Sequence, residues 1–154
     1  VRSISKSGTD KPYGRGSTVV WLFEKEGGSG TPMILGIGCD LAETARIGAA
    51  LNKKGFVERV FTERERAVGT GAHAVEHYAA RFAAKEAFLK ALGTGLREGR
   101  LQDIETGKDD LGKPVLNVTG RFRERLDTLG VTRIHVTLSH TRETAMAVVV
   151  LEGN

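Results

Sequence analysis

The longest helical pattern in the chain runs from about Val75 to Leu92 and constrains the fold more than any other feature. Alanine, leucine, lysine and glutamate make up most of this stretch, and these residue types have high intrinsic helix propensities. Gly93 follows directly, and glycine at this position commonly ends a helix. The sequence therefore predicts one long helix, around which the remaining elements must pack.

One face of this helix carries both apolar and charged residues. Within RFAAKEAFLK, residues 81–90, the spacing of four places Phe82, Glu86 and Lys90 on the same face. Glu86 and Lys90 could form an ion pair worth about 0.2–0.5 kcal/mol. Alternatively, because Phe82 makes this face partly apolar, Glu86 could be a carboxylate directed into a functional site. Helix geometry leaves both interpretations open.

Shorter segments around the long helix place the chain in the α+β class. The expected elements are strands at 33–41, 133–140 and 145–152, helices at 43–53, 56–68 and 121–130, and a hairpin over 101–118 with its turn at 108–113. Thr62 and Glu65 form a capping-box pattern within the second of these helices. Because strands and helices do not alternate strictly, we expect an α+β arrangement.

The chain divides into two parts of different composition. Residues 1–32 are rich in serine, glycine and lysine and end in GGSGTP, which is typical of a linker, whereas a well-patterned domain occupies 33–154. We interpret 1–32 as an appended segment with its linker. The alternative is a natural extension that adds an edge strand at 19–23. The length of 154 residues fits one folded domain.

Composition narrows the function classes. The net charge of +4 is too small to indicate a nucleic-acid-binding protein, and no apolar run reaches the roughly 20 residues that span a bilayer. The start of the chain has no apolar core typical of a secretory signal. A single cysteine, Cys39, excludes an internal disulfide and fits a reducing compartment. We therefore expect a cytoplasmic protein that binds neither membrane nor nucleic acid.

HAVEH, residues 73–77, matches the H-x-x-E-H pattern of a class of zinc peptidases. On a helix, His73 and His77 would share a face, with Glu76 beside them as the general base. The pattern is short, and Gly69 and Gly71 place His73 at the start of the helix, where it frays. A zinc peptidase is therefore an alternative function for this chain.

Basic residues cluster in two places. They are Arg46, Lys53, Lys54, Arg59, Arg64 and Arg66 in one segment, and Arg121, Arg123 and Arg125 in another. Each cluster could be an ordinary solvated helix face, or it could dock an acidic partner. A non-catalytic basic binding module is thus a second alternative function.

Three separated segments carry the remaining candidate residues. GIGCDLAETARI (36–47) contains Asp40, RFAAKEAFLKALGTG (81–95) contains Glu86, and VTLSHTRETAMAVVV (136–150) contains His140. Taken singly, each residue has an ordinary structural explanation: a helix cap, a surface ion pair and a histidine at a strand end.

Together and in this order, the segments resemble the acyl-carrier-protein synthase family. The shared motifs are G-I-G-x-D, R-F-A-A-K-E-A-F-x-K-A-x-G-T-G, D-x-x-G-K-P and S-H-T-x-x-x-A-x-A, and the resemblance runs from Met33 to about Leu151. These proteins are short 4′-phosphopantetheinyl transferases of bacterial fatty-acid synthesis. The resemblance implies their fold, a small antiparallel sheet packed with a long central helix.

The resemblance also implies a reaction. A serine hydroxyl of apo acyl carrier protein attacks the pyrophosphate of coenzyme A, the phosphopantetheine arm moves to the carrier, and 3′,5′-ADP leaves. Mg²⁺ is the expected cofactor, with Asp40 and Glu86 as the matching carboxylate ligands. Whether the serine proton passes to a metal-bound water, or through a water to one of these carboxylates, stays open.

Other site residues follow from the same resemblance. Lys90 is expected to stabilise a phosphate oxygen, and His140 to lie near the coenzyme A phosphates or adenosine, so that Asp40, Glu86, Lys90 and His140 form the catalytic set. Arg81 and Lys85 are expected as further phosphate contacts, although they lie on a different side of the helix from Glu86.

The resemblance also implies binding partners. Acyl carrier proteins are strongly acidic, and the resemblance implies that Arg46 and Arg59 dock the carrier, with Lys53 and Lys54 steering its approach. Family members of this short type resemble homotrimers whose active sites lie between subunits. We therefore expect Asp40 to face Glu86 and His140 that are contributed partly across an interface.

Overall fold

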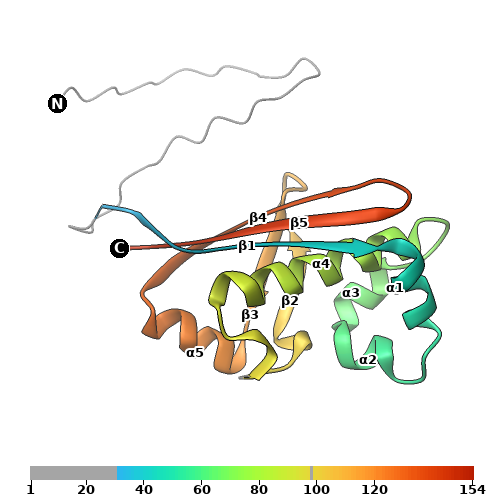
Figure 1. Ribbon diagram of the computed structural model, residues 1–154, viewed down its shortest axis with the longest axis horizontal. Helices are drawn as coiled ribbons and strands as arrows, with labels where there is room; N and C mark the ends of the chain where they lie inside the picture. The colour runs from blue at the N-terminus through green and yellow to red at the C-terminus, as the bar shows by residue number, and fades with distance from the viewer. Residues whose placement is uncertain (1–30, 98) are drawn as a thin grey trace, which may run out of the picture.

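The computed structural model describes residues 31–97 and 99–154, which form an α+β fold (Figure 1). The appended segment, its linker and the alternative strand at 19–23 fall almost entirely on residues 1–30, outside the described ranges. The strands are β1 (Met33–Glu43), β2 (Ile104–Lys108), β3 (Pro114–Val118), β4 (Val131–His140) and β5 (Thr144–Gly153). The helices are α1 (Thr44–Leu51), α2 (Phe56–Val60), α3 (Glu63–Val68), α4 (Ala74–Leu92) and α5 (Gly120–Thr128), with short 3₁₀ turns at Gly95–Arg97 and Leu101–Asp103.

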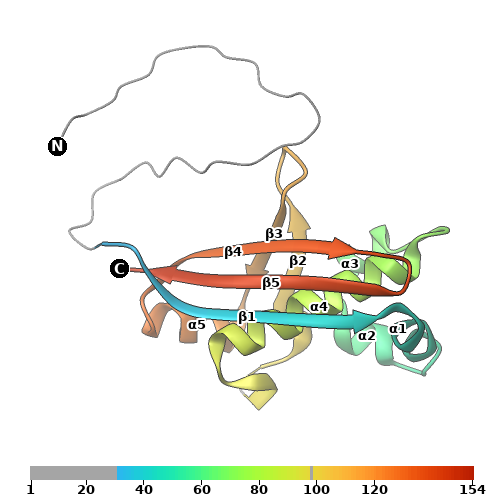
Figure 2. The same cartoon turned by 45° about the horizontal axis from the view of Figure 1, so that its top comes forward.

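Two antiparallel sheets make up the β structure. The larger has the order β1-β5-β4, with β5 in the centre, and the smaller is the β2–β3 hairpin, whose strands run crosswise to α4 in Figure 2. Along β5, buried residues alternate with half-buried ones, as expected for a strand with one face on a core. The predicted small antiparallel sheet packed with a long helix is confirmed.

The predicted long helix is α4, which has 19 residues and lies against β1 and β5. Gly93 ends it in the left-handed conformation (φ 77°), as predicted. Ala83 and Ala87 on its buried face have no exposed surface, so the strands approach closely. On the strand side, a Cβ atom at Gly38 would overlap the carbonyl oxygen of Ala87, and one at Gly36 would overlap that of Ala91. Glycine is therefore required for β1 to lie directly on the helix.

The segment 56–68, predicted as one helix, is two helices, α2 and α3. Phe61 between them is extended (φ −114°, ψ 139°) and fully buried, with its ring 4.7 Å from that of Tyr78. Burial of this side chain interrupts the helix. The predicted capping box is confirmed, because the Thr62 side chain accepts from the Glu65 N–H and the Glu65 side chain accepts from the Thr62 N–H.

β1 is longer than predicted and continues to Glu43, so Asp40 lies within the strand rather than at its end. The hairpin, the last helix and the last two strands occur as predicted, within a few residues at their ends. None of the helices in the described ranges is both long enough and apolar enough to cross a bilayer.

Over β1 and β5, the face of the larger sheet that points away from the helices is apolar. In Figure 1 the labelled helices all lie on the other side of this sheet. Ile37 is 67% exposed and Leu41 is 66% exposed, although both are in regular strand structure. Their register partners are the half-buried Val150 and Met146 of β5. We call the five residues Ile37, Leu41, Met146, Val148 and Val150 the open sheet face.

Candidate active site

Asp40 and Lys90 form an ion pair between β1 and the last turn of α4. The Lys90 Nζ donates to Asp40 Oδ1 at 2.7 Å and to the Cys39 carbonyl oxygen at 3.0 Å. The side chain of Asp40 is 15% exposed, whereas that of Lys90 is 54% exposed. Lys90 therefore pairs with Asp40, a residue distant in sequence, instead of making the helical pair with Glu86 that its spacing allowed.

Glu86 faces the same cleft as Asp40. Burial raises the pKa of Glu86, and the negative charge of Asp40 raises it further, while Lys90 acts in the opposite direction. The cleft has a volume of about 600 Å³ and includes Phe82, which confirms that Phe82 and Glu86 share a face. Two carboxylates thus line one half-enclosed space, and the charge of Asp40 disfavours ionisation of Glu86.

This arrangement fits a divalent cation. Excess negative charge at Glu86 is what a bound cation would relieve, and carboxylate oxygens are the hard ligands that Mg²⁺ prefers. Within the described ranges no group of three or more histidine, cysteine, aspartate or glutamate side chains could hold a metal ion. Two carboxylates completed by phosphate and water oxygens are the usual set for Mg²⁺ at phosphate-containing substrates.

His140 and Arg81 lie in a different cavity of the same chain. This second cavity, of about 390 Å³, is lined by His73, Glu76, His77, Ala80, Arg81, Thr106, Gly107, Lys108, Pro114, Leu138 and His140. The structure therefore brings Asp40, Glu86 and Lys90 together but does not place His140 or Arg81 beside them within one chain.

The second cavity contains polar atoms that are buried without a hydrogen-bond partner. Arg81 is 8% exposed, and its guanidinium bonds the His77 ring at 3.1 Å and the His77 carbonyl oxygen at 3.1 Å. Among the described residues, Arg81 Nε and Thr106 Oγ1 are buried and form no hydrogen bond. Polar groups that are buried without a partner are costly in a protein interior.

The same cavity argues against zinc at the HAVEH motif. Burial lowers the pKa of His77, the positive charge of Arg81 lowers it further, and the Arg81 guanidinium already lies against the His77 ring nitrogen. His73 is exposed, with its ring nitrogen 3.7 Å from a Glu76 carboxylate oxygen. A cation beside His77 would meet the charge of Arg81, so a zinc peptidase finds no support.

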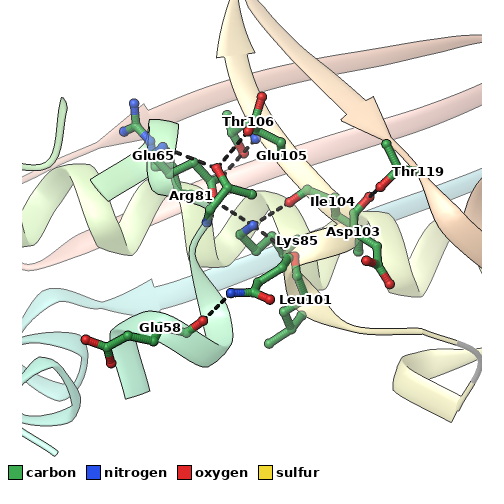
Figure 3. Close-up of polar contacts among 12 residues, drawn as sticks. Glu58, Glu65, Arg81, Lys85, Leu101, Asp103, Ile104, Glu105, Thr106 and Thr119 are labelled. Atoms are coloured by element: carbon green, nitrogen blue, oxygen red, sulfur yellow. Dashed lines mark hydrogen bonds and ion pairs between the residues drawn. The ribbon is translucent and has the colours of Figure 1, made fainter. Parts of the chain in front are cut away.

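Lys85 lies in the core, as Figure 3 shows, and its side chain has no exposed surface. Its ammonium donates to Glu65 Oε2 at 2.8 Å, to the Leu101 carbonyl oxygen at 3.0 Å and to the Ile104 carbonyl oxygen. An ammonium has three donors, and all three are used.

Glu65 completes this buried cluster. One carboxylate oxygen accepts from the Thr106 N–H at 2.8 Å, and the other accepts from the Thr62 N–H at 2.9 Å as well as from Lys85. The Lys85–Glu65 pair thereby ties α4 to α3 and β2. The expectation that Lys85 contacts a phosphate does not fit this burial, and the structure assigns Lys85 a structural role.

A sequence signal for this burial did exist. Arg81, Lys85, Phe88 and Leu92 recur at helical spacing, so the two bases share a stripe with two core residues. The sequence predicts Glu65 only as part of the capping box. Its pairing with Lys85 cannot be predicted from helical spacing, because the two residues lie on different helices.

The predicted docking residues gather beside the first cleft. Arg46 is on α1, Lys53 and Lys54 are in the turn after it, and Arg59 is on α2. All four are exposed, and Arg46 and Lys53 line the cleft together with Asp40 and Glu86. A basic surface thus borders the two carboxylates.

Known proteins provide an independent comparison. Residues 36–149 match the family model of the 4′-phosphopantetheinyl transferase superfamily. A holo-[acyl-carrier-protein] synthase of Syntrophus aciditrophicus is 47% identical over 125 residues, which cover 79% of this chain and 98% of that protein. The corresponding protein of Maridesulfovibrio salexigens is 46% identical, with 78% of this chain and 99% of that protein covered.

Solved structures agree with these relatives. A holo-(acyl-carrier-protein) synthase from Bacillus anthracis, in complex with CoA (3′,5′-ADP), has a TM-score of 0.67 and 42% identity, with 79% of this chain and 99% of that chain covered. The Helicobacter pylori enzyme in complex with coenzyme A has a TM-score of 0.66 and 30% identity, with 75% and 98% covered. By sequence and by fold, this chain belongs to the 4′-phosphopantetheinyl transferase superfamily.

Proposed function

We infer that this protein is a holo-[acyl-carrier-protein] synthase. It transfers the 4′-phosphopantetheine group of coenzyme A to a serine of apo acyl carrier protein, which is a step of fatty-acid biosynthesis. The observation that carries this conclusion is that Asp40 and Glu86 line one cleft, with Lys90 bonded to Asp40, in a chain that matches such synthases along nearly their whole length.

Asp40 and Glu86 would hold a Mg²⁺ ion, which, when bound, supplies positive charge to the pyrophosphate of coenzyme A. Lys90 adds a second positive charge from the last turn of α4, where its exposed ammonium can reach a phosphate oxygen. From there Lys90 would stabilise the charge that develops on the leaving nucleotide, which is the main barrier to this transfer.

In the transfer, the serine oxygen of the carrier bonds to the phosphorus that bears the pantetheine arm. The bond from this phosphorus to the bridging oxygen breaks, and 3′,5′-ADP leaves with the bridging oxygen and its electron pair. The serine proton must go to a base. The carboxylates of Asp40 and Glu86 are the groups of this chain that would accept it through one intervening water.

We propose that the active enzyme is a homotrimer with its active sites between subunits. Two features of the single chain support this proposal. The open sheet face exposes Ile37 and Leu41 on regular strand, and large exposed apolar patches commonly mark protein interfaces. His140 and Arg81 lie in a cavity separate from Asp40 and Glu86, so a neighbouring subunit would have to supply them to the cleft.

Mixed assemblies test the shared site. Asp40→Asn and His140→Ala are each expected to be inactive alone, whereas co-expression should restore activity, because some interfaces then combine an intact Asp40 with an intact His140. Random mixing in a cyclic assembly predicts recovery of about a quarter of the wild-type rate per site. Native mass spectrometry would verify mixing, and mixed oligomers without activity would contradict a shared site.

We propose that the basic surface of α1 and α2 docks the acidic carrier. Arg46→Ala and Arg59→Ala are each expected to raise the KM for the carrier about fivefold, with the KM for coenzyme A unchanged, because rim charges mainly govern encounter with a charged partner. Arg121→Ala on α5, at the other end of the molecule in Figure 1, is the matched control. An equal loss of affinity for both substrates would instead indicate a structural role for these arginines.

The overall function has a direct test. The protein is incubated with apo acyl carrier protein, coenzyme A and Mg²⁺, and the carrier is weighed by mass spectrometry. We expect the carrier to gain one phosphopantetheine group, and to gain none when coenzyme A is omitted. A carrier of unchanged mass across a range of carriers and conditions would refute the function. We further propose a cytoplasmic location, since the exposed thiol of Cys39 suits a reducing compartment.

A further inference from the structure

Lys90 bonds Asp40 in this structure, and in the proposed reaction it contacts a phosphate oxygen of coenzyme A. A single ammonium cannot make both interactions fully at the same time. Its ammonium is bonded to Asp40 Oδ1 at 2.7 Å, and the same carboxylate is the one that would ligate the divalent cation. The transfer reaction, however, needs the Lys90 charge at a phosphate oxygen. The Cys39 carbonyl oxygen, 3.0 Å away, further favours the position at Asp40.

Electrostatics sets these two positions in competition. An ammonium in contact with Asp40 would lie within a few ångströms of a divalent ion bound there, and like charges at that separation repel strongly unless a counter-charge lies between them. Arg46 and Lys53 line the same cleft and add to its positive potential, whereas Glu43 and Glu86 are its other negative groups. Cation binding at Asp40 therefore favours the departure of Lys90.

The side chain of Lys90 can make this move. It is 54% exposed, it is in the last turn of α4, and its long stem has several rotatable bonds. An ion pair exposed to this degree is weak, so breaking it costs little.

We propose that Lys90 is an exchangeable counter-ion of Asp40, which moves to the pyrophosphate of coenzyme A when a divalent cation binds, so that cation and coenzyme A bind cooperatively. This inference rests on the proposed metal-binding role of Asp40 and Glu86. Coenzyme A draws Lys90 away from Asp40 and frees the carboxylate for the cation. By linkage, the cation increases the affinity for coenzyme A by the same factor.

Mn²⁺ binding, followed through the EPR signal of the free ion, tests the proposal without any turnover. In the absence of coenzyme A, Lys90→Met is expected to bind Mn²⁺ about fivefold more tightly than the wild type, because the competing ammonium is gone. If Lys90 instead helped to bind the metal, Lys90→Met would bind Mn²⁺ more weakly than the wild type. Lys90→Gln should behave in the same way as Lys90→Met.

Coenzyme A supplies the second half of the test. It should tighten Mn²⁺ binding by about tenfold in the wild type, and by about twofold in Lys90→Met, where only the added phosphate oxygens still contribute. Lys53→Met is the matched control, because it removes a positive charge from the same cleft without touching the Asp40 ion pair. We expect this control to retain the wild-type cooperativity.

The outcomes separate this inference from the proposed function. If Lys90→Met and the wild type bind Mn²⁺ equally tightly without coenzyme A, the proposed exchange of Lys90 is wrong. The proposed metal-binding role of Asp40 and Glu86 is then unaffected. If Lys53→Met tightens Mn²⁺ binding as much as Lys90→Met does, the effect is general cleft charge and the exchange is again overturned. If the wild type binds no Mn²⁺ with or without coenzyme A, the metal-binding role fails first, and the exchange fails with it.

Discussion

Glu86→Gln is expected to slow phosphopantetheine transfer by at least about 100-fold, the scale on which the loss of one group that stabilises transition-state charge is felt. The amide keeps the size of the side chain but removes the charge that a cation needs. Stability should stay unchanged or rise, because burial and Asp40 make the ionised carboxylate of Glu86 unfavourable in the folded protein. Loss of activity with retained or increased stability is the mark of a functional carboxylate.

Single-turnover transfer assays and thermal unfolding of the same preparation would measure both quantities. Glu124→Gln, an exposed change on α5 outside the cleft, provides the control for loss of one acidic charge. A Glu86→Gln protein with near-normal rates at low Mg²⁺ would show that Glu86 is not a metal ligand. A variant that lost stability together with activity would show that Glu86 serves the fold.

Lys85→Met is expected to lower the free energy of unfolding by about 3–5 kcal/mol, the usual cost of leaving one partner of a buried ion pair alone. Glu65 would remain fully buried with its charge uncompensated, and the carbonyl oxygens of Leu101 and Ile104 would lose their donor. Urea unfolding would measure the change. Lys90→Met, which removes an exposed lysine from the same helix, should change the free energy of unfolding by less than about 1 kcal/mol.

A second variant keeps this prediction testable if Lys85→Met does not fold. Glu65→Gln combined with Lys85→Met removes both buried charges, and we expect it to recover a large part of the lost stability. Wild-type stability in Lys85→Met, together with a raised KM for coenzyme A, would instead make Lys85 the phosphate contact that its sequence position suggested.

Much of the fold follows from local sequence. The length of α4 and its end at Gly93 come from residue propensities, and the alternating strands come from a two-residue period. The break between α2 and α3 does not, because the extended backbone at Phe61 is imposed by the packing of its ring on Tyr78, which lies on another element. Tertiary packing overrode helix propensity at that point.

Local sequence patterns predict less of the candidate site than of the fold. Helical spacing paired Lys90 with Glu86, whereas the folded chain pairs it with Asp40 from β1, and only the resemblance to a family linked these segments beforehand. The resemblance implied that Lys85 contacts a phosphate, whereas the folded chain buries it against Glu65 from another helix. The distance of His140 from the cleft is a property of the assembled chain, which no single segment encodes.

The glycines of β1 have a consequence for how the motif G-I-G-x-D should be interpreted. Gly36, Gly38 and Asp40 are alternate residues of one strand, so all three point toward α4, and both glycines lie against its backbone. A methyl group at either glycine would push the strand outward and withdraw the carboxylate from Glu86. The position of the Asp40 carboxylate relative to Glu86 thus depends on the absence of side chains at Gly36 and Gly38. In related chains, we expect the size of these two residues to covary with the size of the facing helix residues.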